Sequence, residues 1–184
     1  MIRRVLTTLA ALLLFGASPP LPALAAKATP TELTGTVTWV YDADTIDVAP
    51  HGRVRLLGID APEKTASDRD QTFTRLGITL KQLRSTHGAG IAFSVSNLKG
   101  KTVTLVTGAT PRDRHGRLLA YVLLPDGRLF NRLLLEEGLV IVYRRFDFAR
   151  KADFLAAEAE ARQRGAGLWA AGSRPKAGAG KTLK

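Results

Sequence analysis

Cysteine is absent from the sequence of 184 residues. Disulfide bonds and a lipid anchor on cysteine are therefore excluded, and the fold must be held by packing, with or without the help of a bound ion or ligand. The apolar run at residues 5–15 is too short to cross a bilayer, which takes about 20 residues. A membrane span is accordingly not the first expectation for this chain.

Several catalytic patterns are also missing. The three histidines have no metal-ligand spacing, and no serine occupies a nucleophile elbow. Gly100-Lys101-Thr102 resembles the end of a phosphate-binding P-loop, but the earlier glycine that such a loop requires is replaced by Val95. The sequence therefore gives no support for a histidine-based metal centre, a P-loop or a serine nucleophile.

Acidic residues are outnumbered by basic ones, 16 against 27, which gives a formal net charge of +11. Two of these charges lie near the start of the chain and four in its last residues, so the body retains about +5. A basic body favours polyanions through steering and counterion release. Many proteins with a moderate excess bind none, so charge alone supports nucleic acid only weakly.

The two ends differ in composition from the middle. Residues 1–26 combine two arginines, a short apolar run and small residues before a cleavage point, which predicts a signal peptide; an uncleaved anchor is the alternative. We therefore expect a secreted or periplasmic protein that is free of the membrane after cleavage. Residues 27–32 read as a linker, 33–170 as one domain, and 171–184 as a basic disordered tail.

Alternating apolar and polar residues predict five strands. They cover 34–40, 45–49, 53–59, 101–107 and 118–124. The first three, joined by short turns, make a meander.

Helical spacing of apolar residues predicts a helix that includes Phe73 and Leu83, with a break at 85–90. Residues 91–98 fit a helix or a strand equally well. Further helices are predicted at 128–137 and towards Gly165. Five strands with a helix between the third and the fourth predict a mainly β protein with α, a five-stranded OB-fold barrel with added helices.

Three turns carry the polar residues that suggest chemistry. Arg55 lies inside an apolar run, where a guanidinium is rarely buried unless it is paired, and two carboxylates follow on either side of Pro62. The turn at 42–45 adds two more carboxylates, and the turn at 112–117 adds three arginines. Together the three turns provide carboxylates for a hard cation and arginines for an anion.

These motifs resemble, in order and approximate spacing, the thermonuclease family typified by staphylococcal nuclease. The resemblance extends over almost all of residues 33–169. Its most specific part is Arg-x-x-x-x-Asp-x-Pro-Glu followed at a distance by Asp-x-x-Gly-Arg. The segments that carry it are Asp42-Ala43-Asp44-Thr45, Arg55-Leu56-Leu57-Gly58-Ile59-Asp60-Ala61-Pro62-Glu63, Asp113-Arg114-His115-Gly116-Arg117 and Gly167-Leu168-Trp169.

The resemblance implies a Ca²⁺ site. Asp44 and Asp60 match the calcium-binding carboxylates of the family, and the backbone carbonyl of Ala61 matches a further ligand. Oxygen-only ligation suits Ca²⁺, a hard cation that completes its shell with water. Ala43 stands where the family usually has glycine, so the turn and its metal affinity are expected to differ.

The resemblance also implies a nuclease that cleaves DNA and RNA and leaves 3′-phosphates. Glu63 matches the general base, and Arg55 and Arg117 match the arginines that hold the scissile phosphate. Substrate contacts are expected from Arg114, His115 and Tyr143. We expect a monomer acting on DNA and RNA, with single strands favoured.

Simpler interpretations remain open. Each acidic residue by itself would serve equally well to shape a turn, and Asp42 and Asp113 are assigned such supporting roles. Residues 64–87 are longer than the usual connection of the family and are expected to form a surface insertion. A non-catalytic OB-fold module that binds nucleic acid is the alternative function.

Overall fold

The computed structural model describes residues 31–170. The predicted signal peptide, most of the predicted linker and the predicted tail lie outside the described residues. Within the described part, no helix combines the length and the apolar character needed to cross a membrane.

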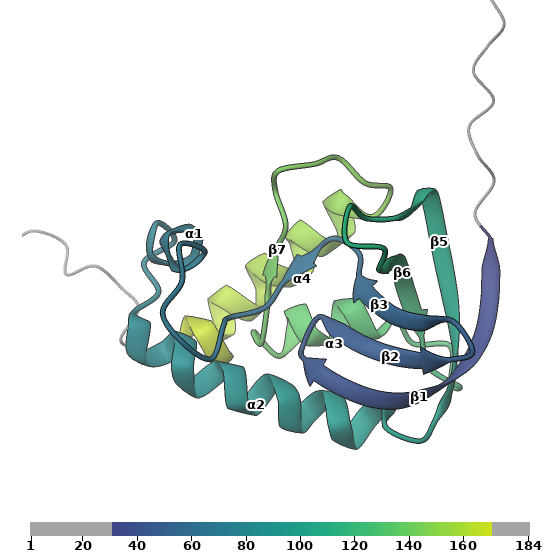
Figure 1. The fold of residues 1–184 in the computed structure, drawn as a ribbon. Coiled ribbons are helices and arrows are strands. Elements are labelled where there is room, and N and C mark those ends of the chain that lie inside the picture. The colour runs from purple at the N-terminus through teal and green to yellow at the C-terminus, as the bar shows by residue number, and fades with distance from the viewer. Residues whose placement is uncertain (1–30, 171–184) are drawn as a thin grey trace, which may run out of the picture.

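Five strands close into a barrel, as predicted (Figure 1). They are β1 (Glu32–Asp42), β2 (Thr45–Ala49), β3 (Gly52–Leu56), β5 (Thr102–Arg112) and β6 (Leu118–Leu123). The order around the barrel is β1-β2-β3-β6-β5, and pairing of β1 with β5 closes it. All neighbours are antiparallel except β3 and β6. The OB-type barrel inferred from the sequence is confirmed.

Alternation along the strands fills the barrel. Ile46 and Val48 of β2 and Val54 and Leu56 of β3 point inward and are almost completely buried. Residues between them point outward, so Arg53 is exposed and Arg55 partly so. The pairing of Thr45 with Arg55 places the turn before β2 beside the middle of β3.

The third expected strand is not continuous. Positive φ at Gly58 (82°) turns the chain after β3, and a short strand, β4 (Ile59–Asp60), leaves the barrel to pair with β7 (Ile141–Val142). A Cβ at Gly58 would lie 2.7 Å from the ring of Phe148, so close packing also requires glycine there. The prediction of a single strand over 53–59 was therefore wrong. The break directs Asp60 back towards the turn at Asp44.

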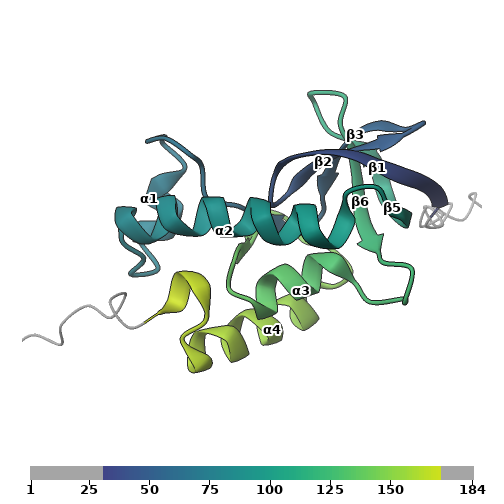
Figure 2. The ribbon, with the colours of Figure 1, turned by 90° about the horizontal axis from the view of Figure 1, so that it is seen from below.

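The segment after Glu63 forms two helices. The expected single helix is divided at Gly77 (φ 84°) into α1 (Asp70–Thr74) and α2 (Leu80–Leu98). Thr79 begins α2 through a capping box with Gln82. The predicted break at 85–90 was wrong, because these residues lie inside α2, which also takes in the undecided residues 91–98. Figure 2 shows α2 running alongside the barrel and beyond it.

The remaining helices form a layer beside the barrel. They are α3 (Phe130–Glu136) and α4 (Lys151–Arg164), which agree with the predicted helices, and a 3₁₀ turn at Gly167–Trp169, which was not predicted. Asn131 of α3 is fully buried, accepting from the Val122 amide (2.9 Å) and donating to the Leu57 carbonyl (2.9 Å). It connects the helical layer to the barrel at the residue that follows β3.

The inserted segment is packed and does not form a simple surface loop. Phe73, Ile78 and Leu83 are buried against Ile141 and the 3₁₀ turn in a second apolar cluster. Buried Asp70 accepts hydrogen bonds from Arg84 of α2, and Arg84 also donates to the Glu63 carbonyl (2.9 Å). The insertion is thus fixed directly beside Glu63.

Replacement of Asp70 by asparagine should destabilise the protein at neutral pH by roughly 1.5–3 kcal/mol, the contribution of a charged hydrogen bond. The hydrogen bonds from Arg84 lower the pKa of Asp70, so their stabilisation is complete above the ordinary carboxyl pKa and is lost as pH falls through the lowered value. Thermal unfolding of wild type and Asp70→Asn from pH 7 to pH 2.5 should therefore converge in acid.

Asp68→Asn is the matched control, because Asp68 lies in the same segment but is exposed. A difference in Tm between Asp70→Asn and wild type that persists unchanged at low pH would contradict this account of the Arg84 contact.

Candidate active site

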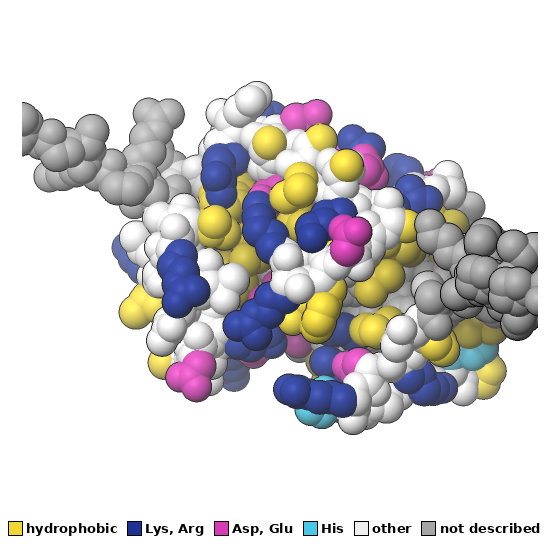
Figure 3. Space-filling view, turned by 90° about the horizontal axis from the view of Figure 1, so that it is seen from above, with side chains coloured by type: hydrophobic (Ala, Val, Ile, Leu, Met, Phe, Trp, Pro, Cys, Tyr) yellow, Lys and Arg dark blue, Asp and Glu magenta, His cyan; other side chains and the backbone are white. Residues whose placement is uncertain are grey.

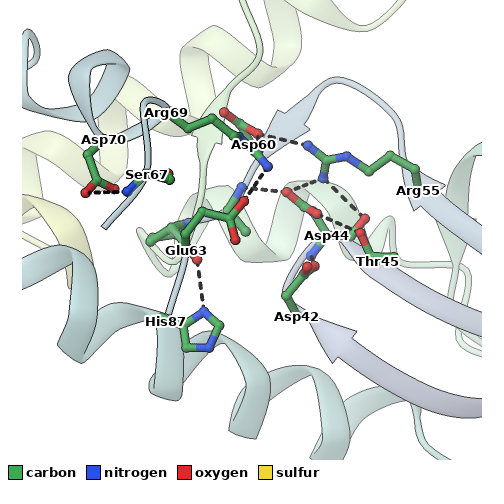
Figure 4. A network of polar contacts seen from close by, with 12 residues as sticks. Asp42, Asp44, Thr45, Arg55, Asp60, Glu63, Ser67, Arg69, Asp70 and His87 are labelled. Carbon is green, nitrogen blue, oxygen red and sulfur yellow. Dashed lines mark hydrogen bonds and ion pairs between the residues drawn. The ribbon is translucent and has the colours of Figure 1, made fainter. Parts of the chain in front are cut away.

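Arg55 lies between two buried carboxylates (Figure 4). Asp44 and Asp60 are 3% and 4% exposed. The Nη2 of Arg55 donates to Oδ1 of Asp60 (2.9 Å), and its Nη1 pairs with the Asp44 carboxylate. Three residues from different turns and strands therefore meet at one point, as the sequence motifs implied.

Backbone groups hold Asp44 in place. Its Oδ2 accepts from the Ala61 amide (2.6 Å), and its Oδ1 accepts from the Thr45 hydroxyl (3.0 Å). The Leu56 amide donates to the Asp44 carbonyl (2.8 Å). Asp44 thus connects the β1–β2 turn to the end of β3 and to the turn after β4.

Burial controls the charge state of these groups. It lowers the pKa of Arg55 to about 10, an effect that the charge of Asp60 opposes and that of Arg69 reinforces. Arg55 remains protonated at neutral pH. Burial raises the pKa of Asp42, while the nearby Arg55 charge opposes the rise. Asp42 accepts from the Asp44 amide (2.9 Å), which suits the turn-shaping role expected of it.

Glu63 lies beside this cluster and is paired with Arg69, a residue that sequence reasoning did not single out. Arg69 contacts both Glu63 and Asp60, and its side chain is 45% exposed. It lies in the inserted segment, just before α1. The sequence shows only a basic residue a few positions after the Pro62-Glu63 turn. Its contacts with Asp60 and Glu63 depend on how the inserted segment folds back, which local patterns do not indicate.

The backbone around Glu63 is fixed from α2. A ring nitrogen of His87, Nδ1, lies 2.9 Å from the Pro62 carbonyl, and Arg84 donates to the carbonyl of Glu63 itself. The candidate base is therefore positioned by the barrel on one side and by the insertion on the other.

Arg117 is held by Asp113 in the turn between β5 and β6. Its Nε (2.8 Å) and Nη2 (2.7 Å) donate to Asp113 Oδ2, while Oδ1 accepts from the amides of His115 and Arg117. Burial by itself would raise the pKa of Asp113, but the bonds from Arg117 and from these amides outweigh it and lower the pKa. Asp113 is thus an ionised support that orients Arg117.

A cleft of about 690 Å³ is lined by Arg69 and Arg117, whereas Arg55 and the carboxylates paired with it are not among its lining residues. Figure 3 shows Lys and Arg side chains spread over the face seen from above, among hydrophobic and fewer acidic ones. Parallel pairing of Leu119 with Arg55 brings the turn that bears Arg117 beside Arg55, close enough for the charge of Arg117 to lower the pKa of Arg55. The lining residues are Asp47, Arg53, Arg69, His115, Gly116 and Arg117.

The expected substrate contacts are distributed unequally. His115 lines the cleft, whereas Arg114 is exposed and donates from Nε to His115 Nε2 (3.1 Å). Tyr143 follows β7, where its amide donates to the Gly58 carbonyl (2.9 Å) and its ring lies 5.6 Å from that of Phe146. It therefore lies next to β4 and is not among the residues that line the cleft.

The residues present fit a hard divalent cation. Within residues 31–170, no three histidine, aspartate or glutamate side chains are grouped as a ready-made metal cage. Asp44 and Asp60 supply two buried carboxylates, and backbone carbonyls and water would have to complete the shell, as Ca²⁺ allows. Without a cation, Arg55 and Arg69 offset the charge of these carboxylates.

Comparisons with known proteins agree with this geometry. The model of the family described as staphylococcal nuclease homologue matches residues 53–171, more than half of the chain. The chain belongs to this family. This is the SNase-like nuclease family, which implies a nucleic-acid substrate.

Individual relatives cover most of the chain. An uncharacterized protein, MJ1439, of Methanocaldococcus jannaschii is 34% identical over 73% of this chain and 70% of its own. An uncharacterized endonuclease of Escherichia coli O157:H7 is 33% identical over 75% and 78%. The thermonuclease of Staphylococcus intermedius is 36% identical over 54% of each chain.

Replacement of Asp113 by asparagine should reduce cleavage of nucleic acid by up to about 100-fold, because Arg117 loses the partner that orients it. Asp126→Asn is a matched control: Asp126 holds Arg128 in the same way, with Oδ1 accepting the amide (3.0 Å) and Oδ2 accepting Nε (2.8 Å), but in the β6–α3 turn. Initial rates measured with both variants test this. Equal rates in the two would show that Asp113 does not orient Arg117.

Proposed function

We propose that the protein is an exported, calcium-dependent nuclease that hydrolyses phosphodiester bonds of DNA and RNA with little sequence preference and leaves 3′-phosphates. The observation that carries the proposal is the convergence of Asp44, Asp60, Glu63 and Arg55 beside an arginine-lined cleft that also holds Arg117. A protein that only binds an anion has no use for three carboxylates at the same place.

The arginines supply the charge that the reaction needs. Attack on a phosphodiester adds negative charge to an anionic centre, and fixed cations offset it without reorganisation. Arg55 and Arg117 are fixed by their carboxylate partners and offer planar, bidentate donors, for which lysine would be a poor substitute. Arg69, exposed at the rim, is a third guanidinium that can exchange a carboxylate for a phosphate oxygen.

Glu63 acts as the general base that orients and deprotonates the attacking water. Its carboxylate is half-buried and pairs with Arg69, which lines the cleft, and Arg84 and His87 fix the backbone around it. A base must lie within hydrogen-bonding reach of the proton that it removes. The fixed position of Glu63 is therefore the first requirement for this role.

Asp44, Asp60 and the Ala61 carbonyl would hold the Ca²⁺ ion. When bound, the ion polarises the phosphoryl group and supports ionisation of water. The same two carboxylates position Arg55. The cation site would therefore adjoin an arginine that binds the phosphate.

The nucleotides next to the scissile bond would contact His115, Arg114 and Tyr143. Phe146 is 70% exposed beside Tyr143, and such rings stack on unpaired bases. This favours single-stranded substrates. A monomer in the periplasm or outside the cell, released by signal cleavage, completes the proposal.

The variants Arg55→Ala and Arg117→Ala should slow cleavage of single-stranded DNA by about 10²- to 10³-fold, by analogy with loss of one oxyanion donor, and Glu63→Gln should also abolish most turnover. Gel assays with Ca²⁺ and then with EGTA measure this. Circular dichroism should show that Arg117→Ala and Glu63→Gln stay folded, whereas Arg55→Ala should also lower the Tm, because Asp44 and Asp60 lose their buried partner.

The same assay separates the alternative function, a non-catalytic OB-fold module. Binding of the strand without any cleavage in Ca²⁺ would favour the module. Full activity in both arginine variants would refute the roles assigned to them.

Calcium should raise the Tm of the wild-type protein, because a ligand that binds only the folded state stabilises it by about 2.7 kcal/mol at 100 times its Kd. Differential scanning calorimetry should show no such rise for Asp44→Asn with Asp60→Asn. Asp47→Asn, a carboxylate at the cleft but outside the cluster, should keep it. An equal rise in the double variant would place the ion elsewhere.

A further inference from the structure

The outer face of β1 exposes two aromatic rings. Val37 and Val40 point into the barrel, and register shifts in the pairing with β2 leave both Thr38 and Trp39 on the outside. Trp39 is 53% exposed and Tyr41 is 39% exposed. About 7 Å separates residues two apart on a strand, so the two side chains leave β1 at neighbouring outward positions.

Each ring is accompanied by a cation. Lys99, at the end of α2, places Nζ 4.9 Å from the centre of the Trp39 ring, and Arg53 of β3 places Cζ 4.1 Å from that of Tyr41. The Tyr41 hydroxyl accepts from Arg53 Nη2 (2.6 Å) and donates to Asp47 Oδ2 (2.6 Å). Tyr41 is therefore fixed with its ring still exposed.

Tyr41 is hydrogen-bonded to two residues that line the cleft of the candidate active site. Arg53 and Asp47 line that cleft together with Arg117. Asp47 also lines a second hollow of about 300 Å³, whose other lining residues are Thr38, Val48, Ala49, Pro50 and Gly52. The two hollows share Asp47 of β2, and this path from the cleft reaches Thr38 of β1, which precedes Trp39 in the chain.

The charge along this path is basic. Lys101 lies beside β1, where its carbonyl accepts from the Val37 amide (3.0 Å), and it adds to Lys99 and Arg53. The opposing carboxylate, Asp47, is already bonded to Tyr41 and lies 3.7 Å from Arg53. Paired aromatic rings and cations are the combination that binds bases and phosphates of a single strand.

We propose that Trp39 and Tyr41, with Lys99 and Arg53, form a second nucleic-acid-binding surface, on which the single strand flanking the scissile bond stacks its bases. The inference rests on the proposed function for its substrate. Base pairs hide the faces of bases inside a duplex, so the surface selects unpaired strands. It anchors long substrates and leaves the chemistry at the cleft unchanged.

Fluorescence offers a direct test, because the chain has two tryptophans and the second, Trp169, is buried. In a Glu63→Gln background, a single strand of about 16 nucleotides, the upper range for an OB barrel, should quench the emission of Trp39. A dinucleotide, which fills only the cleft, should not. Absence of quenching by the bound long strand would overturn the proposal.

Affinity and turnover provide the second measurement. Trp39→Ala should weaken binding of the long strand by roughly 5- to 100-fold, the effect of losing one stacked base, and raise KM for it with kcat unchanged. Trp39→Phe should recover most of the loss. Leu155→Ala, an exposed apolar residue on α4, is the matched control and should change nothing.

The outcomes separate this inference from the proposed function. A wild-type KM and a wild-type affinity of Trp39→Ala for the long strand would overturn the second surface and leave the nuclease intact. Quenching and Trp39-dependent binding without any cleavage would support the surface and reject the nuclease. Unchanged nucleic-acid affinity together with Trp39-dependent capture of a purified protein partner would overturn the inference in favour of a protein-binding face.

Discussion

A guanidinium buried between two carboxylates is the interaction on which this site depends. Taking either charge out of water alone is costly, so Arg55, Asp44 and Asp60 are tolerable in the interior only as a set. Their backbones belong to β3, to the turn before β2 and to β4, so pairing the charges also fixes how these three segments meet. The Ala61 and Leu56 amides complete the arrangement by bonding to Asp44. Compensation of the buried charges and the arrangement of these three segments are therefore a single constraint.

The inserted helices extend that constraint outward. Arg69 binds Asp60 and Glu63 from the inserted segment, and the segment is itself held by the contact between Asp70 and Arg84 and by its own apolar cluster. Glu63 would otherwise follow a short strand into solvent. The insertion supplies a rim for the cleft, a counter-charge for the candidate base and a fixed backbone on either side of it. A segment expected to be peripheral is in this way part of the site.

The sequence predicted the barrel, because strand alternation and turn residues are local signals, and the resemblance to the thermonuclease family singled out Asp44, Arg55, Asp60 and Arg117. The split of the third strand escaped prediction, since the pairing of β4 with β7 joins residues some eighty positions apart. The true boundary of α2 was hidden because its buried face includes Thr86, Gly90 and Ser94, which do not look apolar. Arg69 was missed for the same reason as β4: its partners are near it only after folding.

The arginines of this site can bind an anion through the N–H groups that their ion pairs leave unused. A guanidinium carries five N–H groups, and one carboxylate engages only part of them. Asp113 takes the Nε and Nη2 groups of Arg117, and Arg69 meets its carboxylates while still 45% exposed at the cleft. Each of these two arginines is thus oriented by a carboxylate. Its remaining N–H donors are left for a phosphate that enters the cleft. Because the acids are buried or already bonded, they repel that phosphate little, and pairs that hold the fold together also prepare it to bind a polyanion.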